Sequence, residues 1–283
     1  MQINFVKSFL FALAASSVSA LAVDTEFRCG APEPSAELME ASAIMAIAEA
    51  EAAANGTLAT RQSALTIDTY VHVVATSTSA SAGYLSDATI QSQLRVMNED
   101  YAPSGIQFVL KGTDRTVNSQ WASDSGETAM KTALRKGTYK DLNLYFLSSI
   151  PGGILGYCYF PTSATTSNIR LDGCTIASGT VPGGNISRFN LGKTAVHEIG
   201  HWFGLYHTFQ GGCNGSGDLV DDTPAQASAS SGCPVGRDSC PNQPGLDPIH
   251  NYMDYSDDSC YEEFTPGQNA RMSSMFSQYR AGK

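Results

Sequence analysis

The chain has 283 residues, of which 42% are hydrophobic and 16% are charged. That length and apolar content suit one main domain with a buried core, together with shorter segments outside it. The 17 Lys and Arg against 27 Asp and Glu leave a formal net charge of -10, and no basic patch is visible, so nucleic acid is not expected as a partner.

The amino terminus has the features of a secretory signal peptide. Lys7 precedes an apolar run over residues 8–15, and small residues follow as far as Ala20. The run is too short to span a bilayer comfortably, and the sequence contains no other long apolar run. We therefore expect residues 1–20 to be a cleaved signal peptide, the protein to be secreted and extracellular, and no membrane to be its partner.

Three Asn-X-Ser/Thr tripeptides agree with an extracellular route. They begin at Asn55, Asn185 and Asn214, and each asparagine is a candidate for N-glycosylation. Each tripeptide alone is a weak signal, because the pattern is common by chance.

Residues 21–62 differ in composition from the rest and are interpreted as a propeptide. Alanine and glutamate dominate residues 31–54, which favours a helix, but large apolar side chains are few. Two interpretations stay open: a helix docked on the main domain, and a solvated spacer. Residues 55–62, with Arg61, are expected to form an exposed linker where a protease cuts.

The main domain is expected over residues 63–283, with strands and helices in its first half. Apolar residues alternate in a strand near residues 65–73, where His72 is interpreted as a histidine with sheet partners rather than a ligand. Ser86 caps a helix that breaks at 103–105. The same signals predict these further elements: a strand at 106–110, a helix at 128–136, a strand at 142–147, a segment at 154–161 and a strand at 169–176.

Two more helices are predicted in the second half. One runs from near Asn190 to about Leu205 and carries the motif described next. The other opens at Thr265, and its expected buried residues are Ala270, Met272, Met275 and Phe276.

Residues 197–207 read H-E-x-x-H-x-x-G-x-x-H. His197 and His201 are four apart, so on a helix they lie on one face and can bind one metal ion together. Gly204 has no Cβ, so the helix can end there and the chain can turn to bring His207 back as a third ligand. Three histidines leave the fourth position of a Zn²⁺ ion open, as a catalytic site requires.

Glu198 stands beside a ligand, where it can meet a metal-bound water rather than the metal itself. An ordinary amphipathic helix with incidental histidines would rarely have this pattern, and three of the chain's 5 histidines lie within it.

The motif resembles that of the metzincin zinc peptidases. Residues 251–255 (NYMDY) are similar to the methionine-containing turn beneath the metal, and with residues 221–224 (DDTP) they resemble the pappalysin-type branch, in particular secreted fungal extracellular metalloproteases. The resemblance covers roughly residues 65–280. It implies an α+β fold, namely a metzincin-like catalytic domain with a twisted mixed sheet, an active-site helix and a C-terminal subdomain containing a Met-turn. It also implies an edge strand above the cleft that binds the substrate as an added strand.

Motif and resemblance together predict a zinc metalloendopeptidase that hydrolyses peptide bonds of extracellular proteins. Glu198 would act as general base on a zinc-activated water and then pass the proton to the leaving amine. Tyr255 is either a stabiliser of the tetrahedral oxyanion or a core aromatic. Met253 is expected to be a structural floor under the histidines, because three ligands already fill the site.

Two other functions are compatible with the motif. One is a zinc hydrolase of non-peptide substrates, against which the resemblance and the edge strand argue. The other is a catalytically idle secreted zinc-containing binding protein. Such descendants usually lose the base or a ligand, whereas Glu198 and all three histidines are intact. The expected partners are protein or peptide substrates, and we expect a monomer.

Seven cysteines in a secreted chain leave one without a partner, and the lone one is expected to be Cys29. The other six allow fifteen pairings. Proximity of predicted strands favours Cys158–Cys174. The resemblance favours two further pairs, Cys213–Cys240 and Cys233–Cys260.

Cys29 has two interpretations. A thiolate is a good zinc ligand, so within a propeptide Cys29 could fill the open coordination position and keep the enzyme latent. The segment Arg28-Cys29-Gly30 resembles the cysteine switch of several metzincins. The alternative is a free thiol without function.

Acidic residues carry the remaining expectations. Asp221, Asp222 and Thr223, close to Asp218, offer the oxygen ligands that Ca²⁺ prefers, with a solvated acidic loop as the alternative. Acids at 254, 257 and 258 would favour a basic substrate residue. Ser259, however, stands where the basic-specific relatives lead us to expect an acid, which argues against a strict basic preference.

Overall fold

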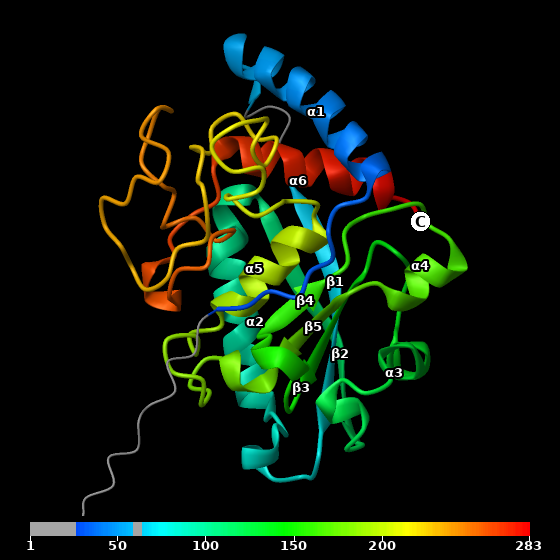
Figure 1. Ribbon diagram of the computed structural model, residues 1–283. Helices are drawn as coiled ribbons and strands as arrows, with labels where there is room; N and C mark the ends of the chain where they lie inside the picture. Colours follow the sequence, from blue (N-terminus) through cyan, green and yellow to red (C-terminus); the bar gives the residue numbers. More distant parts are fainter. Residues whose placement is uncertain (1–26, 59–63) are drawn as a thin grey trace, which may run out of the picture.

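The computed structural model describes residues 27–58 and 64–283 (Figure 1). A sheet of five strands in the order β2-β1-β3-β5-β4 forms its centre. The strands are β1 (Leu65–Ala75), β2 (Ile106–Val117), β3 (Leu142–Leu147), β4 (Gly156–Cys158) and β5 (Cys174–Ala177). All neighbours pair in parallel except β4, which runs antiparallel to β5. The expected mixed sheet is confirmed, and β4 is an edge strand. The predicted signal peptide and Arg61 lie outside the described residues.

Helices cover both faces of the sheet, which explains why β3 is buried along its whole length. On one face, α2 (Asp87–Tyr101) and α5 (Lys193–Trp202) pack over the main core, which includes Leu144 and Phe146 of β3. On the other face, Tyr145 and Leu147 pack against Met130 of α3 (Glu127–Leu134), with α4 (Thr166–Leu171) beside that helix. No helix in the described ranges is long and apolar enough to cross a membrane.

The C-terminal helix α6 (Pro266–Tyr279) begins at the predicted position. Thr265 accepts a hydrogen bond from the Gln268 backbone N–H, and the Gln268 side chain accepts one from the Thr265 backbone, so the two residues form a capping box. The four residues predicted to be buried on this helix are buried. At its end, Arg280 pairs with Asp172 and donates to the Trp202 carbonyl, which ties the C-terminus to α5 and to the turn between α4 and β5.

The predicted strand over residues 169–176 is wrong in its first half. Residues Thr166–Leu171 form α4, because the Thr165 side chain accepts a hydrogen bond from the Asn168 backbone N–H and starts a helix. Gly173, with φ of 103°, then reverses the chain so that β5 begins only at Cys174.

Three other boundaries differ from the prediction. Strand β2 continues beyond residue 110 to Val117, because it stays paired with β1 across a bulge at Thr69/Tyr70. Helix α3 covers Glu127–Leu134 instead of 128–136. Helix α5 starts at Lys193, since Gly192 has φ of 88° and cannot be part of the helix.

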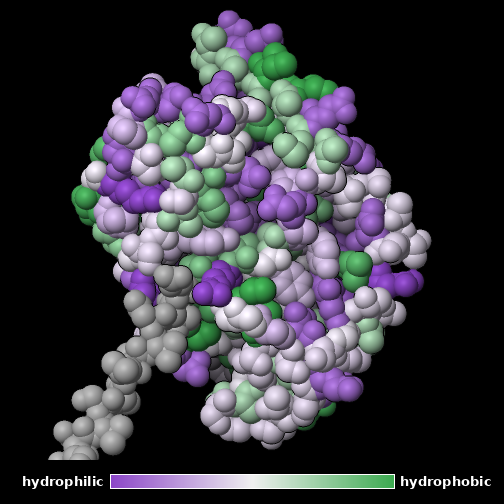
Figure 2. Space-filling model, viewed as in Figure 1, coloured by the Kyte–Doolittle hydropathy of each residue, from purple (hydrophilic) through white to green (hydrophobic). Residues whose placement is uncertain are grey.

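The segment predicted to be a propeptide contains α1 (Ala36–Ala54), which packs against α6. Leu38 is buried against Tyr206, and the Ser42 hydroxyl lies 2.8 Å from the Tyr206 hydroxyl. Glu49 accepts hydrogen bonds from buried Arg271, the shortest at 2.8 Å. Of the two interpretations of this segment, a docked helix and a solvated spacer, the structure has the docked helix. Hydrophobic residues remain exposed on α1 (Figure 2), and these are Met39, Ile44 and Ile47.

Residues 203–257 run mainly as turns and loops, held together by disulfides. The structure has the three expected pairs, Cys158–Cys174, Cys213–Cys240 and Cys233–Cys260, and leaves Cys29 as a free cysteine. The first pair joins the edge strand to β5. The other two cross-link the loop that precedes and follows residues 251–255, where few apolar side chains are available to hold it.

Candidate active site

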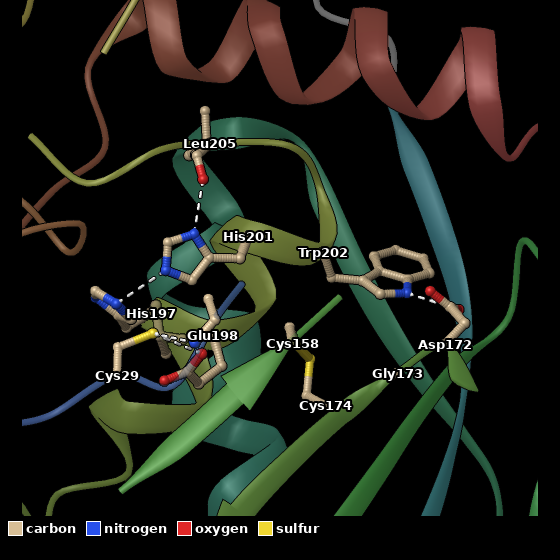
Figure 3. Close-up of a disulfide and its surroundings, with 12 residues drawn as sticks. Cys29, Cys158, Asp172, Gly173, Cys174, His197, Glu198, His201, Trp202 and Leu205 are labelled. Atoms are coloured by element: carbon tan, nitrogen blue, oxygen red, sulfur yellow. Dashed lines mark hydrogen bonds between the residues drawn. A yellow bond between two sulfur atoms is a disulfide. The ribbon is translucent and has the colours of Figure 1, made fainter. Parts of the chain in front are cut away.

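The three histidines of the motif converge on one point. His197 and His201 lie one turn apart on α5, and Gly204, with φ of 92°, reverses the chain so that His207 returns to them. The Nε2 atom of His201 lies 3.2 Å from Nε2 of His197 and 3.0 Å from Nε2 of His207. Figure 3 shows the His197 and His201 rings approaching each other above Glu198.

The hydrogen bonds of these rings decide which nitrogens carry protons. Nδ1 of His197 lies 2.6 Å from the Tyr252 carbonyl, and Nδ1 of His201 lies 2.8 Å from the Leu205 carbonyl. A carbonyl only accepts, so both Nδ1 atoms carry the proton. Burial lowers the pKa of His201 to about 4 and the pKa of His197 and His207 well below the usual value, so the rings are neutral.

The Nε2 lone pairs of His197 and His201 therefore face each other with no proton between them. Such an arrangement is repulsive unless a cation lies at the shared point. Three neutral imidazoles, two of them oriented by backbone carbonyls through their other nitrogen, are a donor set that suits a divalent transition metal. The residues present thus fit the metal that the motif predicts.

Two glycines allow α5 to sit tightly on its surroundings. A Cβ at Gly200 would overlap Sδ of Met253, whose side chain packs against the turn of α5 between His197 and His201. A Cβ at Gly204 would lie 2.8 Å from Cγ of Met275 on α6. Met253 belongs to the turn whose Tyr252 carbonyl orients His197, so this turn packs against α5 at Gly200 and makes a hydrogen bond with His197.

Glu198 is fully buried at the bottom of the site. Burial raises the pKa of its carboxyl group to about 8, against the opposing hydrogen bonds from the Cys29 thiol and the Cys158 backbone. The edge strand lies close to its side chain, since a Cβ at Gly156 would lie only 2.7 Å from Cγ of Glu198. Glu198 is therefore held between α5 and β4, next to the histidines.

Cys29 reaches the same point from the segment predicted to be a propeptide. Its Sγ donates to Oε2 of Glu198 at 3.4 Å (Figure 3), and it forms with the three histidines a group whose ligand atoms all lie within 4.8 Å of one another. Backbone hydrogen bonds hold it there. The Gly30 N–H donates to the Gly156 carbonyl at 2.8 Å, and the Leu155 N–H donates to the Arg28 carbonyl at 2.9 Å. Residues 28–30 thus lie along the free edge of β4, parallel to it.

Tyr255 lies beside the histidines. Its ring centroid is 5.0 Å from that of His207 and 5.7 Å from that of His197. Burial, followed by the charges of Cys29 and Glu198, raises the pKa of its hydroxyl, which stays protonated and able to donate. This position agrees with both interpretations of Tyr255, as a stabiliser of the oxyanion and as a core aromatic, and its catalytic role stays a prediction.

The other predicted positions lie away from this cluster. The Asp222 carboxylate accepts hydrogen bonds from the Thr265 hydroxyl and the Gly267 N–H at the start of α6, while Asp221 is exposed and the Thr223 hydroxyl donates to Asp218. A calcium site at Asp221, Asp222 and Thr223 stays a prediction. The three candidate glycosylation sites, Asn55, Asn185 and Asn214, are all exposed.

The two remaining histidines have structural partners. His72 lies in β1 between Asp114 and Asn143, as predicted, and Nδ1 of His250 lies 2.6 Å from the Cys260 carbonyl. Residues that the sequence analysis missed are Gly156, which closes over Glu198, and Phe27, whose ring lies 4.9 Å from that of His197. Only the position of Phe27, two residues before Cys29, could have drawn attention to it.

A buried three-histidine cluster with a glutamate beside it, set under the edge strand of a mixed sheet, defines a metzincin-type metalloendopeptidase. The family model Peptidase M43, described as pregnancy-associated plasma protein-A, matches residues 138–277. An extracellular metalloprotease of Pyricularia oryzae is 93% identical over 283 residues, which is the whole of both chains. A relative from Neurospora crassa, also called an extracellular metalloprotease, is 58% identical over 98% of both chains. The chain belongs to this pappalysin-type family of metalloproteases.

Solved structures agree with this assignment. Mirolysin in complex with a compound called compound 9 has a TM-score of 0.67 and 30% identity, over 78% of this chain and 94% of that chain. Mature mirolysin of Tannerella forsythia with a cleaved peptide has a TM-score of 0.64, again at 30% identity, over 76% of this chain and 92% of that chain. The predicted family, fold class and enzyme class are confirmed.

Proposed function

We propose that this metalloprotease is a secreted, zinc-dependent endopeptidase that hydrolyses peptide bonds of extracellular proteins and is made as a latent precursor. The observation that carries the proposal is the convergence of three neutral, buried imidazoles and Glu198 directly beneath the outer edge of β4, the edge along which residues 28–30 lie. An edge strand with unpaired backbone groups is where an extended peptide adds to a sheet. Relatives that are called extracellular support secretion of this chain.

In this proposal His197, His201 and His207 hold a Zn²⁺ ion. When bound, the ion supplies Lewis-acid chemistry, which polarises the scissile carbonyl and acidifies water. Glu198 accepts the proton from the attacking water and returns it to the leaving amine. The Tyr255 hydroxyl donates a hydrogen bond to the tetrahedral oxyanion. Met253, in the Met-turn, supports the histidines from below.

Latency follows from the position of the propeptide. Residues 28–30 occupy the strand edge that a substrate would use, and the Cys29 thiol points into the ligand cluster. Residues 21–62 then form the propeptide and residues 63–283 the catalytic domain. The match to mature mirolysin covers 76% of this chain and 92% of that one, and that share of this chain agrees in length with a catalytic domain over residues 63–283.

The first experiment is cleavage of unfolded casein by the processed protein, with and without a zinc chelator, beside Glu198→Ala. We expect activity that the chelator abolishes, that added zinc restores and that the variant lacks. An active Glu198→Ala would refute its role as the base. A zinc-loaded, processed protein that cuts nothing would instead favour a binding protein or a non-peptide substrate.

Latency has its own test in Cys29→Ser. The variant loses the thiol that faces the histidines but keeps the backbone hydrogen bonds of residues 28–30. We expect the unprocessed chain to gain peptidase activity and to lose its propeptide sooner. A precursor that stays just as latent would show that the thiol does not control the site.

A further inference from the structure

The propeptide places a second side chain into the site besides Cys29. Phe27 is only 4% exposed, although it lies at the start of the described chain. In an extended strand, residues two apart point to the same side, so Phe27 and Cys29 face the site together. The Phe27 ring lies 5.5 Å from Phe189, 4.9 Å from Tyr255 and 4.9 Å from His197, measured between ring centroids.

The pocket that receives Phe27 is apolar. Leu155 and Phe189 are buried against its ring, and Ile186 and Tyr255 complete the walls. Leu155 directly precedes the edge strand, and its N–H donates to the Arg28 carbonyl. The pocket therefore lies beside the groove in which a strand added to β4 would run, adjacent to a predicted metal ligand.

The carboxylates nearest in sequence to this region accept hydrogen bonds from groups outside the pocket, although one buried oxygen of Asp254 and one of Asp258 have no hydrogen-bond partner among the described residues. Asp257 accepts hydrogen bonds from the Arg188 guanidinium, and Asp258 accepts from the Leu191 and Lys193 backbone N–H groups. Asp254 accepts from the Gln226 side chain and the Ser230 N–H. A basic side chain entering the pocket would lose its hydration against apolar walls, which is costly, whereas an apolar one would gain by burial.

We infer that this pocket, walled by Leu155, Ile186, Phe189 and Tyr255, selects an aromatic or large aliphatic substrate side chain next to the scissile bond, and that Phe27 occupies it in the precursor. The inference rests on the proposed function for its substrate, but not for the pocket itself. Cys29 marks where the metal-facing position of an added strand lies. Phe27 marks where the neighbouring side chain on the same face of that strand goes.

The first test measures the pocket in the intact, zinc-loaded precursor, without peptide cleavage. The rate at which a thiol reagent modifies Cys29 reports how firmly residues 27–30 are held, and Cys29→Ser supplies the blank. The matched variants are Phe27→Leu and Phe27→Met, which keep an apolar side chain, against Phe27→Ala and Phe27→Lys.

We expect Phe27→Leu and Phe27→Met to react about as slowly as the parent chain. Phe27→Ala and Phe27→Lys should react about tenfold faster or more, since each loses most of the burial of the ring. A Phe27→Lys chain as slow as the parent would overturn the inference, because a basic side chain would then suit the pocket.

The second test maps cut sites of the processed enzyme in a mixture of peptides. We expect Phe, Tyr, Leu or Met at one fixed position flanking the scissile bond, and Ile186→Asp, but not Ile186→Leu, should raise the share of Lys and Arg there. A dominant Lys or Arg at that position in the parent enzyme would overturn the inference. If no peptide is cut, the proposed function fails, while the thiol rates still decide the preference of the pocket.

Discussion

Gly156→Ala is expected to impair catalysis without unfolding the protein. An added Cβ would lie 2.7 Å from Cγ, 3.0 Å from Oε1 and 3.1 Å from Cδ of Glu198. Relief to an ordinary contact of 3.4 Å requires a shift of about 0.7 Å (3.4 minus 2.7) by the glutamate or by the edge strand. A misplacement near 1 Å can cost about 100-fold in rate, so we expect kcat to fall about 10- to 100-fold, or about 1.4–2.7 kcal/mol in the barrier.

The assay is steady-state hydrolysis of one peptide by the processed enzyme, with thermal unfolding measured on the same samples. Gly112→Ala is the matched control, because Gly112 also lies in a strand and its added Cβ would meet Tyr70 at 3.7 Å, an ordinary contact. Neither glycine has a positive φ, so alanine suits both backbones. A kcat for Gly156→Ala within about threefold of the parent, at unchanged melting temperature, would refute the reasoning.

Three further predictions concern stability. Arg280 and Asp172 are both at most 1% exposed, so Arg280→Met leaves the Asp172 carboxylate buried without its cationic partner. The variant should lose about 3–5 kcal/mol of the free energy of unfolding measured in urea. A loss under about 1 kcal/mol would contradict this prediction. Glu49→Ala removes the buried partner of Arg271 between α1 and α6. Backbone amides of α1 should then exchange with deuterium at least about tenfold faster than in the parent. Unchanged exchange would mean that the ion pair of Glu49 and Arg271 does not hold α1 in place. Burial raises the pKa of Asp258 to about 7, so the folded state favours its protonated form. The free energy of unfolding should therefore fall as pH rises from about 4 to about 7, by no more than about 4 kcal/mol. Asp258→Asn should reduce that fall in a pH series of urea titrations, and an unaltered pH dependence would exclude Asp258 as its source.

The grouping of the predicted zinc ligands could be inferred from the sequence because their geometry is local. His197, His201 and Glu198 lie within one turn and a half of helix, where backbone periodicity alone decides which side chains share a face. The turn that returns His207 depends on one glycine at the end of that helix. The same holds for α2 and α6, whose starts were marked by the capping residues Ser86 and Thr265.

Boundaries were harder because tertiary partners set them. The strand expected over 169–176 lost its first half to α4, where an N-cap at Thr165 and a buried hydrogen bond from Trp202 to Asp172 favour a helical turn. Strand β2 extends past residue 110 because β1 continues beside it, and a strand lasts as long as its neighbour supplies hydrogen-bond partners.

The sequence by itself predicted the metal ligands and the glutamate beside them, and it determined the family and the succession of most elements, since each depends on spacing within a few residues. Only the tertiary structure decided which side chains meet across the chain. It brought Cys29 to within 3.4 Å of Glu198, 169 positions away, and set Phe27 against Phe189 and Tyr255. It also closed Gly156 over the glutamate. Contacts of this kind depend on sheet order and on how the layers pack, and neither leaves a periodic signal in the residues themselves.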